Sequence, residues 1–179
     1  MKRFILILCL PLLSFAHPHM YVDVDITLSL KNKQIQTANI AWTFDDMNSQ
    51  ILLMDYDKNG DTKFDKKETL FFKSEVFDKL GEYEYYTHIL IDDKKIPIDK
   101  RNSHFHLTFE KNRFIVHYTV SLVDIEQKKS VVFGFWDKDF FSSFDIASKD
   151  VHFQGGELPI MIDEVEDDIY MGVVLKLSL

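Results

Sequence analysis

The feature that most constrains the fold is the alternation in "HMYVDVDITLSL", residues 19–30, where apolar residues fill the even positions and mainly polar ones the odd. Side chains of a β-strand point alternately to opposite faces, so a period of two predicts a strand with one buried face. The segment "QIQTANIAWTF", residues 34–44, follows after the short turn "KNK". Together the two segments predict a β-hairpin.

The period changes at Asp45, which begins "DDMNSQILLMDY". Aspartate caps helix N-termini, so we expect a helix to start here. Residues 66–80, "KKETLFFKSEVFDKL", predict a second helix, with Gly81 as its C-cap. Its apolar stripe is predicted to comprise Leu70, Phe71, Phe77 and Leu80.

The loop between these helices carries oxygen ligands at the spacing of a calcium-binding EF-hand. A register starting at Asp55 puts Gly60 at the sixth position but a lysine at the twelfth, where a bidentate carboxylate is required. A register starting at Asp57 supplies every ligand, and puts Thr62 where glycine normally takes a positive φ. The alternative interpretation is a solvated acidic turn. The predicted calcium ligands are Asp57, Asn59, Asp61, the Lys63 carbonyl, Asp65 and Glu68.

Strand patterns resume after the helices. We therefore expect an α+β fold, a β-sandwich-like antiparallel domain with an inserted EF-hand-like helix-loop-helix at about residues 45–81. The further strands are expected at 84–92, 103–110, 113–123, 130–136, about 150–153 and 170–178.

The first sixteen residues have the pattern of a secretory signal peptide. A basic start precedes the apolar run "FILILCLPLL", which is too short to span a bilayer, and "SFA" places small residues before a cleavage point after Ala16. We expect a periplasmic domain of residues 17–179. Cys9, the only cysteine, lies in the leader, so disulfides and thiolate metal sites are excluded from the mature chain.

The charge of the mature chain restricts its partners. Loss of the leader's two basic residues takes the formal net charge from -8 to -10. Such a chain repels nucleic acid and anionic membrane surfaces and suits cations. No later segment is long enough to cross a membrane, so we expect no direct membrane insertion after cleavage.

Cleavage after Ala16 would make His17 the N-terminal residue, with a free amine beside its imidazole. His17, His19, Asp23 and Asp25 share one face of the predicted strand. Imidazoles with a carboxylate suit zinc, and also nickel, cobalt or copper. We therefore predict a transition-metal site at His17, His19 and Asp23, with Asp25 as a weaker candidate.

A second histidine cluster follows from strand pairing. "SHFHLTFEKNRFIVHYTV" predicts a hairpin turning at Lys111 and Asn112, in which paired residue numbers sum to 223. His106 then faces His117, and His104 lies two residues away on the same face, close enough to share a metal. The alternative is that these are partly exposed histidines on a polar sheet face. His88 and His152 are interpreted as structural.

The N-terminal "HPH", "DVD", "WTFDD" (42–46) and the acidic loop together resemble a periplasmic domain-of-unknown-function family linked to nickel/cobalt/zinc-type permeases, which includes ZevA-like zinc-binding proteins. "FWDKDFFSSFD" (135–145) is similar to a further segment of that family, although it lacks the usual proline. The resemblance implies a zinc-binding periplasmic component that works with a membrane metal permease. It also implies a role for Asp45, within its tryptophan motif.

The leading hypothesis is therefore a non-enzymatic metal-binding protein that exchanges an ion with a permease, and carries a structural calcium-type loop. No nucleophile turn and no glycine-rich phosphate loop is present. A copper-dependent redox protein that uses the His17 chelate is one alternative. A secreted structural module that binds only calcium is the other.

Overall fold

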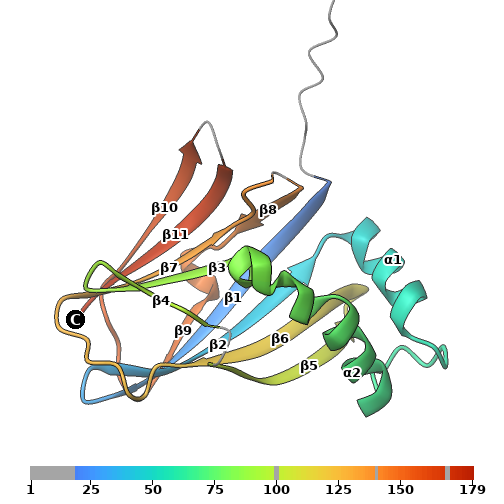
Figure 1. Cartoon of the computed structure of the whole chain (residues 1–179), viewed down its shortest axis with the longest axis horizontal. Coiled ribbons are helices and arrows are strands. Elements are labelled where there is room, and N and C mark those ends of the chain that lie inside the picture. The colour runs from blue at the N-terminus through green and yellow to red at the C-terminus, as the bar shows by residue number, and fades with distance from the viewer. Residues whose placement is uncertain (1–18, 99–100, 140, 168–169) are drawn as a thin grey trace, which may run out of the picture.

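Two β-sheets face each other in the computed structural model, which describes residues 19–98, 101–139, 141–167 and 170–179 (Figure 1). The first sheet has the order β5-β6-β2-β1-β8, with β9 also paired to β1, and the second has the order β10-β11-β7-β3-β4. The strands are β1 (Met20–Lys31), β2 (Gln34–Phe44), β3 (Thr87–Ile91), β4 (Lys94–Ile96), β5 (Asn102–Glu110), β6 (Arg113–Ser121), β7 (Ser130–Trp136), β8 (Ser142–Asp145), β9 (Val151–Gln154), β10 (Ile160–Asp167) and β11 (Tyr170–Ser178). This is a mixed α/β architecture with a sandwich-like arrangement of its sheets.

The predicted hairpin of β1 and β2 is confirmed, with Asp25 opposite Ala41 and Ile26 opposite Ile40. The even positions of β1 are buried from Val22 to Leu28, because they face the second sheet. The odd positions of β1 lie on the outer face of the first sheet. The alternation in the sequence therefore sets which face of this sheet carries polar side chains.

The prediction of an antiparallel domain does not hold at one edge of β1. β8 pairs in parallel with the start of β1, with Met20 opposite Ser142. β9 pairs in parallel with its second half, with Thr27 opposite His152. Two short strands thus share one edge of β1, and each of β8 and β9 has only four residues, too few for a clear periodic pattern.

The helices lie between β2 and β3 and cover one end of the first sheet beside β5 and β6 (Figure 1). They are α1 (Asp46–Tyr56), α2 (Lys66–Glu75) and the 3-10 segment η1 (Phe77–Tyr86). A second, short 3-10 turn, η2 (Ser148–Asp150), precedes β9. No helix among the described residues is long and apolar enough to cross a membrane.

The predicted apolar stripe of the second helix is wrong in part. Phe72 is the buried aromatic residue of α2 and stacks on Phe105 of β5, whereas Leu70 and Phe71 are exposed. The helix also ends earlier than predicted, because the chain turns at Val76 and continues as η1. Gly81 lies inside η1 and is therefore not the C-cap of α2.

Candidate functional site

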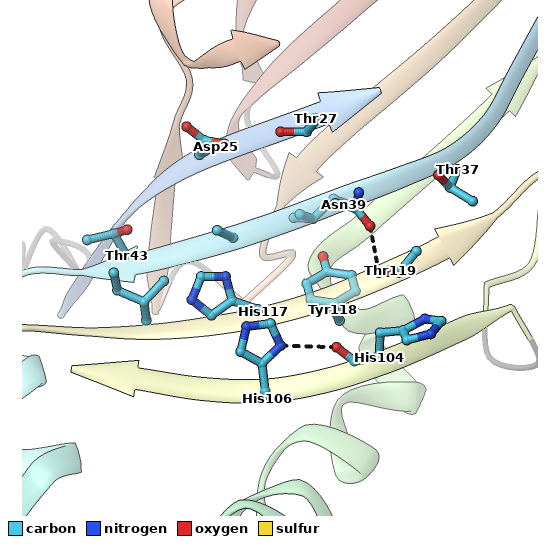
Figure 2. Close-up of a pocket in the computed structure, with 13 residues that line it drawn as sticks. Asp25, Thr27, Thr37, Asn39, Thr43, His104, His106, His117, Tyr118 and Thr119 are labelled. Atoms are coloured by element: carbon cyan, nitrogen blue, oxygen red, sulfur yellow. Dashed lines mark hydrogen bonds between the residues drawn. The ribbon is translucent and has the colours of Figure 1, made fainter. Parts of the chain in front are cut away.

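A polar row crosses the outer face of the first sheet. His106 of β5 is opposite His117 of β6, His117 is opposite Ala41 of β2, and Ala41 is opposite Asp25 of β1. The row lines a hollow of about 660 Å³, whose other walls are mostly threonine and asparagine side chains (Figure 2). Because outward residues of neighbouring strands share one face, the row gathers residues that lie far apart in the sequence.

The predicted register of the second hairpin is confirmed. His106 pairs with His117, Leu107 with Val116, and Phe109 with Phe114. The two imidazoles stack face to face, with ring centroids 4.3 Å apart and an interplanar angle of 2° (Figure 2). The nitrogen lone pairs lie in the ring planes, and those of two stacked rings do not converge, so one ion bound by both requires a side-chain rotation of at least one ring.

Electrostatics hold the His117 ring neutral. Burial lowers the pKa of His117 to about 4, the neighbouring His106 lowers it as well, and Asp25 acts in the opposite direction. Thr108 Oγ1 lies 2.9 Å from His117 Nε2 and fixes the orientation of the ring. A neutral imidazole is the form that binds metals, so His117 is ready for coordination at neutral pH without losing a proton.

His104 lies beside the pair but is not brought into it. The register shifts between Ser103 and His106, and His104 takes a left-handed φ of 53°. Its ring bonds to Ser103 Oγ at 3.0 Å, and its carbonyl lies 3.3 Å from His106 Nδ1. Figure 2 shows the His104 ring apart from the other two. His104 still lines the same hollow as the pair, as predicted, but the bulge turns its ring away from them.

His152 joins this face, although sequence reasoning set it aside. Its Nε2 lies 3.0 Å from Asp25 Oδ2. The contact arises from the parallel pairing of β9 with β1, which brings in a segment 127 residues away along the chain. The strand pattern near residue 152 was visible in the sequence, but nothing there indicated that its partner is β1.

The described N-terminal candidates lie away from the histidine pair. His19 is six residues before Asp25 along β1, a separation of about 20 Å in a strand. The His19 ring stacks on Phe141 at 6.2 Å. His17 lies outside the described residues.

Asp23 and Asp45 both accept hydrogen bonds from other parts of the protein. Asp23 Oδ2 accepts from Arg113 at 3.2 Å and lies four residues, about 13 Å, from His19. Asp45 caps α1 by accepting from the Asn48 backbone N–H, and its second oxygen accepts from the Tyr21 backbone N–H. Burial raises the pKa of Asp45, but these hydrogen bonds outweigh burial and lower it overall.

The acidic loop joins α1 to α2, where the predicted calcium ligands lie. Thr62 takes the left-handed conformation, with φ of 60°, at the position where the pattern requires it. Asp57 accepts backbone hydrogen bonds from Gly60, Asp61 and Thr62 at 2.9 to 3.2 Å. Asn59 and Asp61 side chains accept further backbone N–H groups within the loop.

Glu68 closes this loop. It is 5% exposed, and it accepts from the backbone N–H groups of Lys58, Asn59 and Asp65 at 2.8 to 3.2 Å. Asp65 caps α2 in a capping box with Glu68. Across the described residues, no three histidine, aspartate or glutamate side chains are grouped so as to hold a metal ion. Cation binding in this loop therefore requires Glu68 to exchange backbone donors for the ion.

The fold and this face define a class: a two-sheet α/β protein with an inserted pair of helices and histidines on one sheet face. Residues 3–159 match the family described as "Protein of unknown function (DUF1007)", and the chain belongs to this family. It is similar to the "Uncharacterized 15.5 kDa protein in trpE 3'region" of Spirochaeta aurantia, with 32% identity over 92 residues, 51% of this chain. The chain spans 65% of the length of that relative.

Proposed function

We propose that this protein is a non-enzymatic, periplasmic metal-binding protein whose ion is zinc, and that His106 and His117 provide its central ligands. The observation that supports this most directly is the direct opposition of the two imidazoles on adjacent strands, 4.3 Å apart. Zinc binds neutral imidazole nitrogen, and His117 is held in the neutral form.

The site has the properties of one that exchanges its ion. It offers two protein imidazoles on an open sheet face, so water completes the coordination and the ion can leave. Asp25 lines the same hollow and supplies a carboxylate there, and His152 bonds to that carboxylate at 3.0 Å from the neighbouring β9. The sequence resemblance, and nothing in the fold, suggests a membrane metal permease as the partner and His17 with His19 as a second ligand pair.

Calorimetry with zinc on the chain from residue 17 onward tests this proposal. We expect His106→Ala combined with His117→Ala to weaken zinc binding at least tenfold. His152→Ala is the matched control, because its strand is about 14 Å from β6 across the sheet, and it should change affinity little. Unchanged affinity in the double variant, with its fold intact by circular dichroism, would contradict the site.

His17→Ala combined with His19→Ala gives the second arm of the experiment. If the N-terminal pair is the main site, this variant loses binding and the sheet-face variant does not. If both variants lose one equivalent each, the protein carries two zinc sites. Cobalt in place of zinc reports the coordination number by its absorption spectrum, which separates a two-imidazole site from a site with more protein ligands.

We also propose that residues 57–68 form an EF-hand-like calcium loop with a structural role. The left-handed Thr62 and the flanking α1 and α2 support this proposal. Release of the Glu68 carboxylate from the backbone of Lys58 and Asn59 would free it as the bidentate ligand. We expect weak binding, on the order of 10⁻⁴–10⁻³ M, as in extracellular modules.

Thermal unfolding in calcium tests the loop. Calcium should raise the midpoint temperature of unfolding of the native chain, and Glu68→Gln should abolish this increase. Glu75→Gln, an exposed glutamate at the end of α2, is the matched control and should retain it. Equal shifts in both variants would show that calcium acts elsewhere.

A further inference from the structure

One face of α1 is apolar and open to solvent. Met47, Ile51 and Met54 follow one another at i, i+4 and i+7, the spacing of residues that share one side of a helix. Their exposed fractions are 64%, 48% and 80%. We call these three side chains the α1 stripe, and it extends about 10 Å along the helix. Figure 1 shows α1 at the edge of the molecule.

The opposite face of α1 already attaches the helix to the sheet. Ser49 is fully buried, and its hydroxyl bonds to the backbones of Phe44 and Phe114. Leu52 and Tyr56, at i+3 and i+7 from Ser49, pack against the core. The α1 stripe is therefore not needed to hold α1 in place. A helix that is apolar on both sides is normally covered on both, and here one side is uncovered.

The charge around the α1 stripe is negative. Residues 45–57 contain four aspartates and no lysine or arginine. Asp46 and Asp55 lie near the two ends of the stripe. Asp55 is exposed, and the side chain of Asp46 is 89% exposed although Arg113 lies 3.6 Å away. A partner that complements this surface must therefore present apolar side chains flanked by positive charge.

The same charges disfavour two other occupants. Packing of α1 against α1 in two copies of the chain would bring four or more aspartates together without a basic residue in either helix, because α1 has none. An anionic membrane surface is repelled in the same way, because the chain has a formal net charge of -8. A basic partner is favoured over both.

The length and the side chains of the α1 stripe suit a helical partner. Anchors at i, i+4 and i+7 over about 10 Å match the apolar residues of an amphipathic helix laid along α1. Two of the three anchors are Met47 and Met54, and methionine side chains are flexible and polarisable, so they adapt to the shape of a partner.

We propose that the α1 stripe is a docking surface for a basic amphipathic helix of a partner protein. The apolar side of that helix packs on Ile51 and the two methionines, and its lysine or arginine side chains pair with Asp46 and Asp55. The stripe belongs to α1 and not to the hollow around the histidine pair, so the proposal does not depend on metal binding.

A fluorescently labelled peptide of leucine and lysine, about 14 residues long with its leucines at helical spacing, is the probe. Fluorescence anisotropy measures its binding to the chain from residue 17 onward. A scrambled peptide has the same charge without the apolar face and should bind at least roughly tenfold more weakly. Replacement of the peptide's lysines by glutamate should weaken binding as well. Nuclear magnetic resonance on the ¹⁵N-labelled protein should show that the lysine peptide shifts the signals of α1.

Ile51→Gln and Met54→Gln test the α1 stripe, because glutamine keeps the charge and the helix propensity but removes apolar surface. Each should weaken peptide binding roughly tenfold. Met161→Gln is the matched control, because Met161 is 53% exposed on β10 of the other sheet, and it should bind the peptide normally. Asp55→Asn should weaken binding about threefold, whereas Asp124→Asn, at an exposed position after β6, should not.

Three results would overturn the proposal. One is equal binding of the amphipathic and scrambled peptides, or equal affinity of Met54→Gln and Met161→Gln, which would reduce the interaction to net charge. Another is a dimer in sedimentation without peptide that Met54→Gln dissociates, which would assign the stripe to a second copy of the chain. The third is binding to phosphatidylcholine vesicles that Met54→Gln abolishes, which would assign the stripe to a lipid surface.

Discussion

The Gln127 side chain pairs with the backbone of Ile35 as though it were another residue of the sheet. Its Oε1 accepts from the Ile35 N–H at 2.9 Å, and its Nε2 donates to the Ile35 carbonyl at 2.7 Å. Gln127 is 4% exposed and Ile35 is fully buried. Two backbone groups at the beginning of β2 thus depend on one side chain from the loop before β7.

Gln127→Leu should destabilise the protein by about 2–4 kcal/mol, because it leaves a buried donor and a buried acceptor without partners. Urea unfolding measures this loss. Gln154→Leu is the matched control at an exposed position, and we expect a change within about 0.5 kcal/mol. Similar losses of stability in both variants would mean that the two hydrogen bonds between Gln127 and Ile35 contribute little to the free energy of unfolding.

Thr62→Gly should stabilise the loop by about 1 kcal/mol, because glycine adopts the left-handed conformation without the Cβ clash. Gly60→Ala tests the same physics in reverse. Gly60 has φ of 73° and no atom close to an added Cβ, so only backbone strain changes, and a loss of about 1 kcal/mol is expected. Thermal unfolding of both variants without calcium gives the comparison. A destabilised Thr62→Gly would show that the threonine side chain matters more than its backbone.

The alternation of polar and apolar residues predicted much of the fold, because it depends only on which side chains of one strand are buried. β2, β7 and β11 begin and end where the sequence places them, since alternating side chains on a half-buried strand leave a clear period. The second hairpin was predicted in register because the turn at Lys111 and Asn112 fixes it. β4, β8 and β10 were not predicted. β4 and β8 are too short to show a period.

The candidate site was only partly predictable, because long-range pairing decides its members. The opposition of His106 and His117 followed from one turn, so it could be derived. The bulge at His104 could not be derived, because a bulge has no signature in the alternation of polar and apolar residues. The contact of His152 with Asp25 could not be derived either, because no short turn joins a parallel edge strand to its partner and fixes their register. Whether the leader is cleaved and where zinc binds stay predictions.

The stability of the metal-free protein should fall as the pH is lowered from 6.5 toward 4. The pKa of His117 is lowered from 6.5 to about 4 in the fold, so the unfolded chain binds a proton in this range that the folded chain does not. The contribution is on the order of 1 kcal/mol after allowance for solvent screening at this half-buried site.

Urea unfolding at several pH values, with a chelator present, measures the slope of the free energy of unfolding against pH. His117→Gln should flatten it, because the titrating group is gone. Thr119→Val is the control on the same strand and face, with no titrating group, and it should keep the slope of the native chain. A slope that persists in His117→Gln would assign the pH dependence to other groups.

Ser49→Ala should destabilise the protein even though alanine is the better helix former. The Ser49 hydroxyl donates to the Phe44 carbonyl at 3.0 Å and accepts from the Phe114 N–H at 2.9 Å, at a fully buried position. It thereby ties α1 to β2 and β6. Loss of these bonds costs about 1–3 kcal/mol, against a gain of a few tenths from helix propensity.

Ser74→Ala on α2 is the matched control for this variant. Ser74 is exposed and its hydroxyl donates to the Phe71 carbonyl of its own helix, so its replacement should be neutral or slightly stabilising. Chemical unfolding of both variants separates the two effects. If Ser49→Ala proves as stable as Ser74→Ala, apolar packing holds α1 against the sheet. The hydrogen bonds of the Ser49 hydroxyl to Phe44 and Phe114 would then contribute little to stability.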